Sequence, residues 1–284
     1  MLQVFSLVAM EKPAGRDPES IRDAKVNLLR HVKPITLEDS LLGQYVANNG
    51  KPGYKDDDTV PKDSICPTFA TLVLWIENER WKKVPFILKA GKGLDNAKAE
   101  VRIQFKDTPK GSLFEGAVRN ELVLRIQPGE AIYFKFNNKN PGLSQQIITT
   151  DLDLTYKDRY KDMRGKNKNI IRIKYSIFYL EEKSYLHIKI LIYAFFYIVP
   201  DAYEGLILDV LRSDHSNFVR DDELDAAWRI FTPLLHKIER DRVQPKPYPY
   251  GSRGPKELDD FIKKYGVVRR SDVPYQWPVQ SVAK

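Results

Sequence analysis

Ala99-Glu-Val-Arg-Ile-Gln-Phe105 alternates strictly between apolar and polar side chains. Val101, Ile103 and Phe105 therefore share one face of an extended strand, and the polar residues between them share the other face. The same strand-like character recurs at residues 68–76, 84–88, 121–126 and 131–136. Short connections, with Pro-Gly pairs at 128–129 and 141–142, predict that these strands form one sheet with mostly antiparallel neighbours.

Helical periodicity is found on both sides of these strands. Residues 1–10 have the pattern of the end of a buried helix, and a charged helix is expected from Pro18 to about His31. After Pro200 we expect helices at 201–212, from Asp221-Asp222 onward, and at 256–264. The second of these carries an apolar stripe made of Leu224, Ala227, Trp228, Phe231, Leu234, Leu235 and Ile238. Pro233 should kink it.

Composition and charge exclude several classes of protein. The 284 residues are 42% hydrophobic and 30% charged, which is typical of a globular protein. The net charge of +8 arises mostly in residues 164–199, which hold seven basic and two acidic residues. A nucleic-acid-binding protein is therefore a poor first hypothesis. The single cysteine, Cys66, cannot form a disulfide framework, and the four histidines are scattered along the chain, so we expect neither disulfides nor a metal site.

Targeting and membrane signals are weak. The apolar start Met1–Met10 has no basic region before it and no small-residue cleavage site after it, so we expect no signal peptide. The longest apolar run, Ile190–Val199, has ten residues, whereas a membrane span needs about twenty. The expected location is the cytoplasm, without membrane contact.

Residues 164–199 differ from the rest in composition, because Ile, Lys, Tyr, Phe, Leu and Asn make up 26 of the 36 residues. Such residues come from A/T-rich codons, so our interpretation is an insertion, such as a translated intron, within a domain formed by 1–163 and 200–284. An amphipathic element on a surface or membrane is the functional alternative.

Positive side chains repeat along the predicted strands. Arg102-Ile-Gln104 and Arg125-Ile-Gln127 place Arg and Gln on the same face of two strands. Further cations near this layer are Lys89, Lys92, Lys98, Lys135 and Arg253. Guanidinium and ammonium groups on one face bind phosphate, and Tyr133 or Trp277 could supply an aromatic surface. The alternative is a solvated strand face with surface ion pairs.

Catalytic motifs are not apparent. Gly91-Lys92-Gly93 is too short to be a phosphate loop, and a Gly-x-Gly-x-x-Gly dinucleotide fingerprint is absent. Glu121, Glu130, Asp151 and Asp153 offer carboxylates, but the sequence does not place two of them around a substrate. We therefore assign no catalytic residue.

Long stretches of the chain match the pattern of one known family in the same order. The stretches before residue 130 are Leu7-Val-Ala-Met-Glu-Lys-Pro13, Arg22-Asp-Ala-Lys25, Gly43-Gln-Tyr45, Ile76-Glu-Asn-Glu-Arg-Trp81, Val84-Pro-Phe-Ile-Leu-Lys-Ala-Gly-Lys92, Lys98-Ala-Glu-Val-Arg-Ile-Gln-Phe105, Arg119-Asn-Glu-Leu-Val123 and Ile126-Gln-Pro128. The later ones are Asp153-Leu-Thr-Tyr156, Pro200-Asp-Ala-Tyr-Glu204, Ala227-Trp-Arg-Ile-Phe-Thr-Pro-Leu-Leu235 and Tyr250-Gly-Ser-Arg-Gly-Pro255. With these stretches the chain resembles the glucose-6-phosphate dehydrogenase family. The resemblance implies the C-terminal α+β domain of that family, a large and mainly antiparallel sheet with helices packed on one side.

The resemblance also implies ligands and partners. Lys92 and Gln127 match positions that contact glucose 6-phosphate. The positions that match a second, structural NADP+ site are Lys89, Lys98, Arg102, Arg125, Tyr133, Lys135, Asp153, Thr155, Arg253 and Trp277. Ala97 and Lys89 stand where arginines are expected. A homo-oligomer paired through the sheet is expected.

The family reaction oxidises glucose 6-phosphate at C1 with NADP+. The resemblance places the catalytic NADP+ site and the general base before Met1, in a dinucleotide-binding domain that this sequence does not include. We therefore expect no turnover by this chain alone. The alternative function is a module for structural NADP+ binding and oligomerisation.

Overall fold

The computed structural model describes residues 1–112, 115, 117–143, 146–155, 172–179, 188–195, 202–215 and 218–268. It divides the chain into two compact units. The first unit comprises Met1–Lys92 and Asp162–Tyr248, and the second comprises Gly93–Lys161 and Pro249–Lys284. The predicted α+β class with mainly antiparallel neighbours is confirmed.

Where the sequence predicts one large sheet, the structure has two four-stranded sheets and a two-stranded one. The first sheet has the order β10-β1-β2-β3. These strands span Lys246–Pro249, Ser40–Val46, Phe69–Leu74 and Phe86–Gly91. The polar, glycine-containing link after β3 ends the pairing: Gly93 has a φ of 58°, and Leu94 bridges to Ser252 instead.

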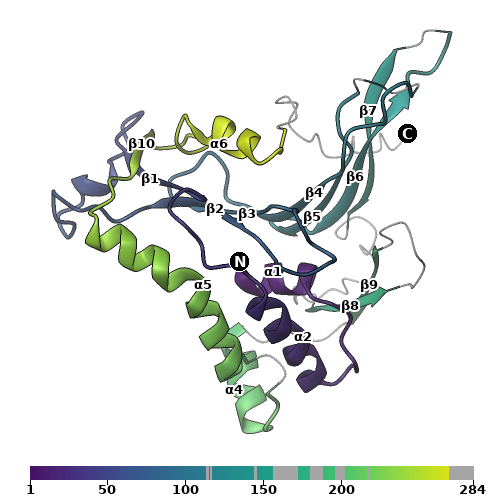
Figure 1. The fold of residues 1–284 in the computed structure, drawn as a ribbon, viewed down its shortest axis with the longest axis horizontal. Helices are drawn as coiled ribbons and strands as arrows, with labels where there is room; N and C mark the ends of the chain where they lie inside the picture. Colours follow the sequence, from purple (N-terminus) through teal and green to yellow (C-terminus); the bar gives the residue numbers. More distant parts are fainter. Residues whose placement is uncertain are drawn as a thin grey trace, which may run out of the picture. The chain divides into compact units, whose positions relative to one another are not determined.

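Three helices complete the core of the first unit: α1 (Leu2–Ala9), α2 (Pro18–Arg30) and α5 (Asp221–Arg240). Their buried side chains pack with those of β1 and β2 into one apolar cluster that includes Phe5, Leu29, Leu74, Ile230 and Leu234. Figure 1 shows α2 and α5 side by side. The first unit also contains α4 (Ala202–Leu211) and the short 3-10 helix η1 (Tyr54–Asp56).

The start of α2 has a sequence-encoded cap. The Asp17 side chain accepts hydrogen bonds from the Ser20 backbone N–H at 2.9 Å and from the Ser20 hydroxyl at 2.6 Å. Pro18 occupies the first helical turn, where its missing N–H costs no hydrogen bond. The helix therefore begins where the sequence predicts it.

The exposed face of α5 corrects the predicted apolar stripe. Leu224, Trp228 and Leu235 are 49%, 56% and 44% exposed. The buried positions are Glu223, Ala226, Ile230, Leu234 and Ile238. Arg220 is the N-cap residue, and Asp221 and Asp222 lie in the first turn, where negative charge stabilises the helix dipole.

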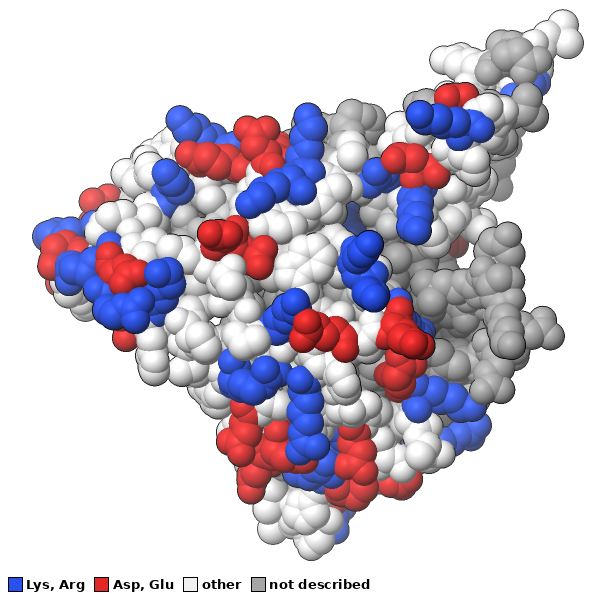
Figure 2. Space-filling view, in the orientation of Figure 1, with Lys and Arg blue, Asp and Glu red and all other residues white. Residues whose placement is uncertain are grey.

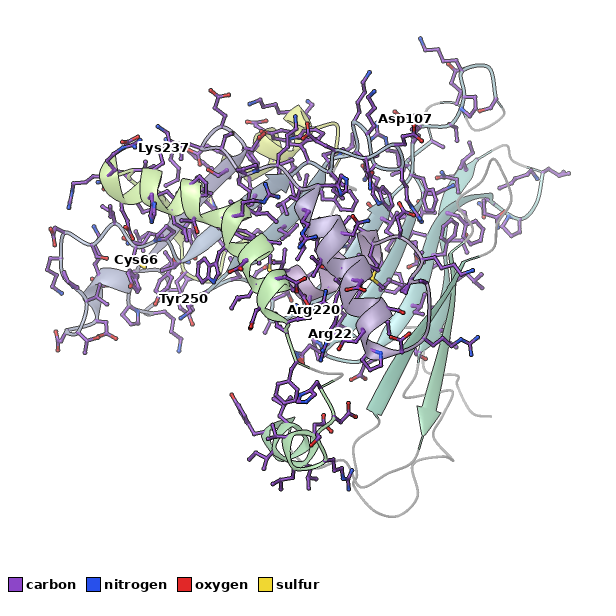
Figure 3. The ribbon with its side chains drawn as sticks, turned by 60° about the horizontal axis from the view of Figure 1, so that its bottom comes forward. Arg22, Cys66, Asp107, Arg220, Lys237 and Tyr250 are labelled. Carbon is purple, nitrogen blue, oxygen red and sulfur yellow. The ribbon has the colours of Figure 1, made fainter. Side chains whose placement is uncertain are left out.

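Arg220 fastens the start of α5 to α2. Its guanidinium donates hydrogen bonds to Glu19 Oε2 at 2.8 Å and Asp23 Oδ1 at 2.6 Å, both on α2, and to Asp222 Oδ1 at 2.7 Å. Figure 3 shows Arg220 close to Arg22 of α2, which itself donates to Glu19 at 2.7 Å. A network of charges thus supplements the apolar contact between the two helices.

The two-stranded sheet lies within the segment that we interpret as an insertion. Arg172–Tyr179 (β8) pairs antiparallel with Ile188–Phe195 (β9). This pairing does not decide whether residues 164–199 are an insertion, so that interpretation stays a prediction.

The second unit contains the second four-stranded sheet, in the order β4-β5-β6-β7. Its strands span Ala99–Gln104, Glu121–Gln127, Ala131–Lys139 and Ile147–Thr155, and the helix α6 spans Leu258–Lys264. All neighbours are antiparallel. The strictly alternating residues Ala99–Gln104 therefore form β4, an outer strand of this antiparallel meander.

Candidate functional site

Six of the twelve predicted ligand-binding residues lie on one face of the β4–β7 sheet. The pairing register forms three adjacent cross-strand rows on this face. These rows are Glu100-Arg125-Ala131-Thr155, Arg102-Val123-Tyr133-Asp153 and Gln104-Glu121-Lys135-Asp151. We call this set of residues the polar face. The register thus brings Arg102, Arg125 and Lys135 to the same side of the sheet, as the alternation predicts.

Acidic side chains share the polar face, which corrects the expectation of a cationic surface. Arg102 Nε lies 2.7 Å from Glu100 Oε1, and Arg102 Nη1 lies 3.2 Å from Glu121 Oε2. Lys98 Nζ lies 3.0 Å from Glu100 Oε1. The alternating pattern places Glu100 on the same side as Arg102, so the charges compensate each other instead of accumulating.

The pKa values of this pair reflect the contact. Burial acts to raise the pKa of Glu100, but the hydrogen bonds and charges of Arg102 and Lys98 outweigh it and lower that pKa. Burial likewise acts to lower the pKa of Arg102, and Glu100 more than compensates and raises it. Both groups are therefore ionised in the folded protein.

Tyr133 lies at the centre of the polar face and is completely buried. The Lys135 ammonium and the Arg125 guanidinium lie 5.6 Å and 5.9 Å from its ring centroid, within the range of cation–π attraction. Lys135 also pairs with Asp151 at 3.2 Å. Burial raises the pKa of the Tyr133 hydroxyl, so the group is a neutral hydrogen-bonding group.

The segment after α6 borders the polar face. Gln104 donates to the Val268 carbonyl at 2.6 Å and accepts from the Val268 N–H at 3.0 Å. Arg119 donates to the Gly266 carbonyl and to Gln104 Oε1. Residues 266–268 are thus held against the β4 end of the site.

Gln127 and Arg253 lie elsewhere in the second unit. Gln127 is exposed at the end of β5, opposite Ala99. Arg253 lies outside the sheet and pairs with Asp259 at 3.2 Å. Trp277 lies outside the described residues.

Lys89 and Lys92 belong to the first unit. Lys89, on β3, places its ammonium 5.8 Å from the centroid of the Phe69 ring. Lys92 follows β3, and its backbone is fixed on both sides: its N–H donates to the Thr68 carbonyl at 2.9 Å, and its carbonyl accepts from the Tyr248 hydroxyl at 2.7 Å. The Lys92 side chain is exposed, so the ammonium is accessible to an anion.

Glu100, Glu121 and Asp151 are the members of the site that the sequence analysis did not assign. The separation of Glu100 from Arg102 by one residue signals a shared face within one strand. The pairing of Glu121 with Arg102, and of Asp151 with Lys135, depends on the register between strands, which one sequence does not determine.

Three further observations concern metal binding, membrane-spanning helices and the distribution of surface charge. Among the described residues, no group of three or more His, Cys, Asp or Glu side chains could hold a metal ion. No described helix is long and apolar enough to cross a membrane. Figure 2 shows positive and negative side chains interspersed over the visible face, so that face offers no broad basic patch.

Comparison with known proteins identifies the family. The family model of the glucose-6-phosphate dehydrogenase C-terminal domain matches residues 1–171 and 181–278. The glucose-6-phosphate 1-dehydrogenase of Emericella nidulans is 49% identical over 282 residues, which are 98% of this chain and 48% of the relative. That of Saccharomyces cerevisiae is 48% identical over 282 residues, which are 98% of this chain and 49% of the relative.

A solved structure, glucose-6-phosphate dehydrogenase in complex with its substrate glucose-6-phosphate, superposes with a TM-score of 0.77 at 46% identity. The match covers 95% of this chain and 49% of the solved chain. The chain thus spans about half the length of the relatives that it matches. The family model and the identities agree that the chain belongs to the glucose-6-phosphate dehydrogenase family and corresponds to its C-terminal domain.

Proposed function

We propose that the chain contributes to the NADP+-dependent oxidation of glucose 6-phosphate at C1, which gives 6-phosphoglucono-δ-lactone and NADPH. Its relatives carry the name of that enzyme, and the structural neighbour is described with that substrate. In this proposal Lys92 and Gln127 contact the sugar phosphate. The exposed Lys92 ammonium, on a backbone fixed by Tyr248, supports that role.

The polar face is our proposed site for a second NADP+, bound as a structural cofactor. The observation that carries this proposal is the register, which puts Arg102, Arg125 and Lys135 in adjacent rows around the buried Tyr133 ring. Guanidinium and ammonium donors fit phosphate oxygens, and the buried Tyr133 ring attracts the Arg125 and Lys135 cations by cation–π contact and so helps to position them. Lys98, Asp153 and Thr155 complete the site, with Lys89, Arg253 and Trp277 as further proposed contacts.

A second copy of the chain is the proposed partner for the other face of this sheet. We call it the apolar face: Val101, Ile103, Phe105, Leu122, Leu124, Ile126, Ile132, Phe134, Phe136, Leu152 and Leu154. Leu152 and Phe105 are 68% and 37% exposed. Burial of such a surface is favourable, which supports a homo-oligomer paired through the sheet.

Fluorescence titration tests the structural site. NADP+ should quench tryptophan emission of the purified chain, and Arg102→Ala should weaken that binding. Saturable quenching that Arg102→Ala leaves unchanged would refute the assignment of the polar face.

Activity of the chain alone is a separate proposal. We infer that it binds NADP+ and associates with itself but does not turn over, because hydride transfer requires a coenzyme held over C1 and a base at the C1 hydroxyl. We assign neither role to a residue of this chain. NADPH formation, followed by absorbance with glucose 6-phosphate and NADP+, should not exceed the blank.

Two further proposals concern the protein in the cell. We expect it to be located in the cytoplasm. We also propose that residues 164–199 are an insertion, and sequencing of a transcript across these residues would test this.

A further inference from the structure

Glu100 occupies the donors that an anionic ligand of the polar face would need. Its Oε1 atom lies 2.7 Å from Arg102 Nε and 3.0 Å from Lys98 Nζ, so one carboxylate oxygen binds two cations. Its side chain is only 12% exposed, which places the carboxylate within the site.

The second oxygen of this carboxylate is in a different environment. Glu100 Oε2 is buried and has no hydrogen-bond partner among the described residues. A buried carboxylate oxygen without a donor loses its hydration without replacement. Glu100 is therefore held through one oxygen while the other is unfavourably placed, and this lowers the free-energy cost of moving the side chain away.

A phosphate group and Glu100 cannot both use the same face of Arg102. Both are anions that seek the same N–H donors, and at a separation of a few ångströms they repel each other. We propose that Glu100 is a built-in competitor of the phosphorylated ligand: it neutralises Arg102 and Lys98 in the ligand-free chain and must be displaced before a phosphate binds there. This inference rests on the proposed structural NADP+ site and adds a residue that sets its affinity.

The test is the affinity of Glu100→Gln, which preserves the size of the side chain and removes its charge. We expect the full chain carrying this substitution to bind NADP+ and inorganic pyrophosphate about fivefold more tightly than the unmodified chain. The affinity should also fall more steeply with salt, because the freed cations are no longer neutralised internally. Isothermal titration calorimetry at two salt concentrations measures both effects.

Asp260→Asn is the matched control, since it removes one negative charge from an exposed position on α6 of the same unit. It should leave both affinities within twofold of the unmodified chain, a difference that is about the usual scatter. An equal gain in this control would show a general charge effect and overturn the inference. Glu100→Ala serves as a second variant if Glu100→Gln does not fold, with circular dichroism as the check.

The outcomes separate this inference from the proposed function. If Arg102→Ala abolishes binding of either probe and Glu100→Gln binds that probe no more tightly, Glu100 is a positioning residue or a bystander, and the inference fails while the site stands. If Arg102→Ala leaves NADP+ affinity intact, the structural site is misplaced, and the pyrophosphate titration alone decides the role of Glu100. If neither probe binds any variant, both proposals are wrong.

Discussion

Lys25 on α2 and Glu223 on α5 form an ion pair with 2.9 Å between Lys25 Nζ and Glu223 Oε2, and both side chains are buried. Gln3 of α1 joins them, since its amide donates to Glu223 Oε1 at 2.5 Å and accepts from Lys25 at 3.0 Å. The first two helices and the sequence-distant α5 thus meet at one polar contact inside an apolar core.

Removal of one partner of this pair should be costly. Glu223→Ala leaves the Lys25 ammonium buried without its counter-charge, and we expect a loss of about 3 kcal/mol in the free energy of unfolding. Urea denaturation followed by circular dichroism measures it. Glu239→Ala, at an exposed position of the same helix, is the control and should change the stability by less than about 0.5 kcal/mol. If the two substitutions lowered the free energy of unfolding equally, the buried ion pair would contribute no more to stability than an exposed side chain.

Acid should destabilise the start of α5. The hydrogen bond from Arg220 lowers the pKa of Asp222 below its usual value of 3.8. A carboxyl group whose pKa is lowered by folding contributes stability above its unfolded pKa and loses that contribution as the pH falls through its folded pKa. Asp222→Asn should therefore flatten the dependence of the unfolding free energy on pH below about pH 4. Urea titrations at several pH values measure this, and parallel curves for the two proteins would contradict it.

Tyr248, on β10, connects Thr68 and the Lys92 backbone through its hydroxyl group. Its hydroxyl contacts Thr68 Oγ1 at 3.0 Å and the Lys92 carbonyl at 2.7 Å, and its ring packs against Phe69. Tyr248→Phe retains the ring and deletes these contacts, so we expect a loss of about 1–2 kcal/mol. Thermal denaturation measures the loss. Faster amide hydrogen exchange at Lys92 would locate the effect, whereas uniform exchange would indicate a global change.

Leu152 tests the proposed pairing through the apolar face. Because its side chain is 68% exposed, Leu152→Lys should cost an isolated chain less than about 0.5 kcal/mol. The same substitution at an interface buries an unpaired charge and should dissociate the oligomer. Light scattering gives the mass in solution. Leu143→Lys, in the fully exposed turn before β7, is the control and should leave the mass unchanged.

The sequence predicts β4, β5 and β6 well because each has one polar and one apolar face. It does not reveal β1, whose residues Leu41–Gln44 are all buried, so that no alternation is visible. β7 is also missed: it lies at the edge of its sheet, Thr150 interrupts its apolar face, and its polar face carries aspartates, which are depleted in strands.

The candidate site was predictable within single strands, and its contacts between strands were not. Residue parity alone places Arg102 and Glu100 on one face, whereas the contacts of Glu121 with Arg102 and of Asp151 with Lys135 require the register. On α5, Leu234 and Ile238 of the predicted stripe are buried. The rest of the buried face is Glu223, Ala226 and Ile230, and Glu223 is buried as a member of an ion pair, which apolar periodicity does not reveal.

The exposed face of α5 has a practical consequence for any preparation of this polypeptide. The apolar side chains of Leu224, Trp228 and Leu235 are exposed to solvent along one side of a long helix. A solvatochromic dye should bind to these side chains while the fold is intact. The dye fluorescence would then be high before heating, and its increase on unfolding would be small. Circular dichroism is therefore the better reporter for each variant described above.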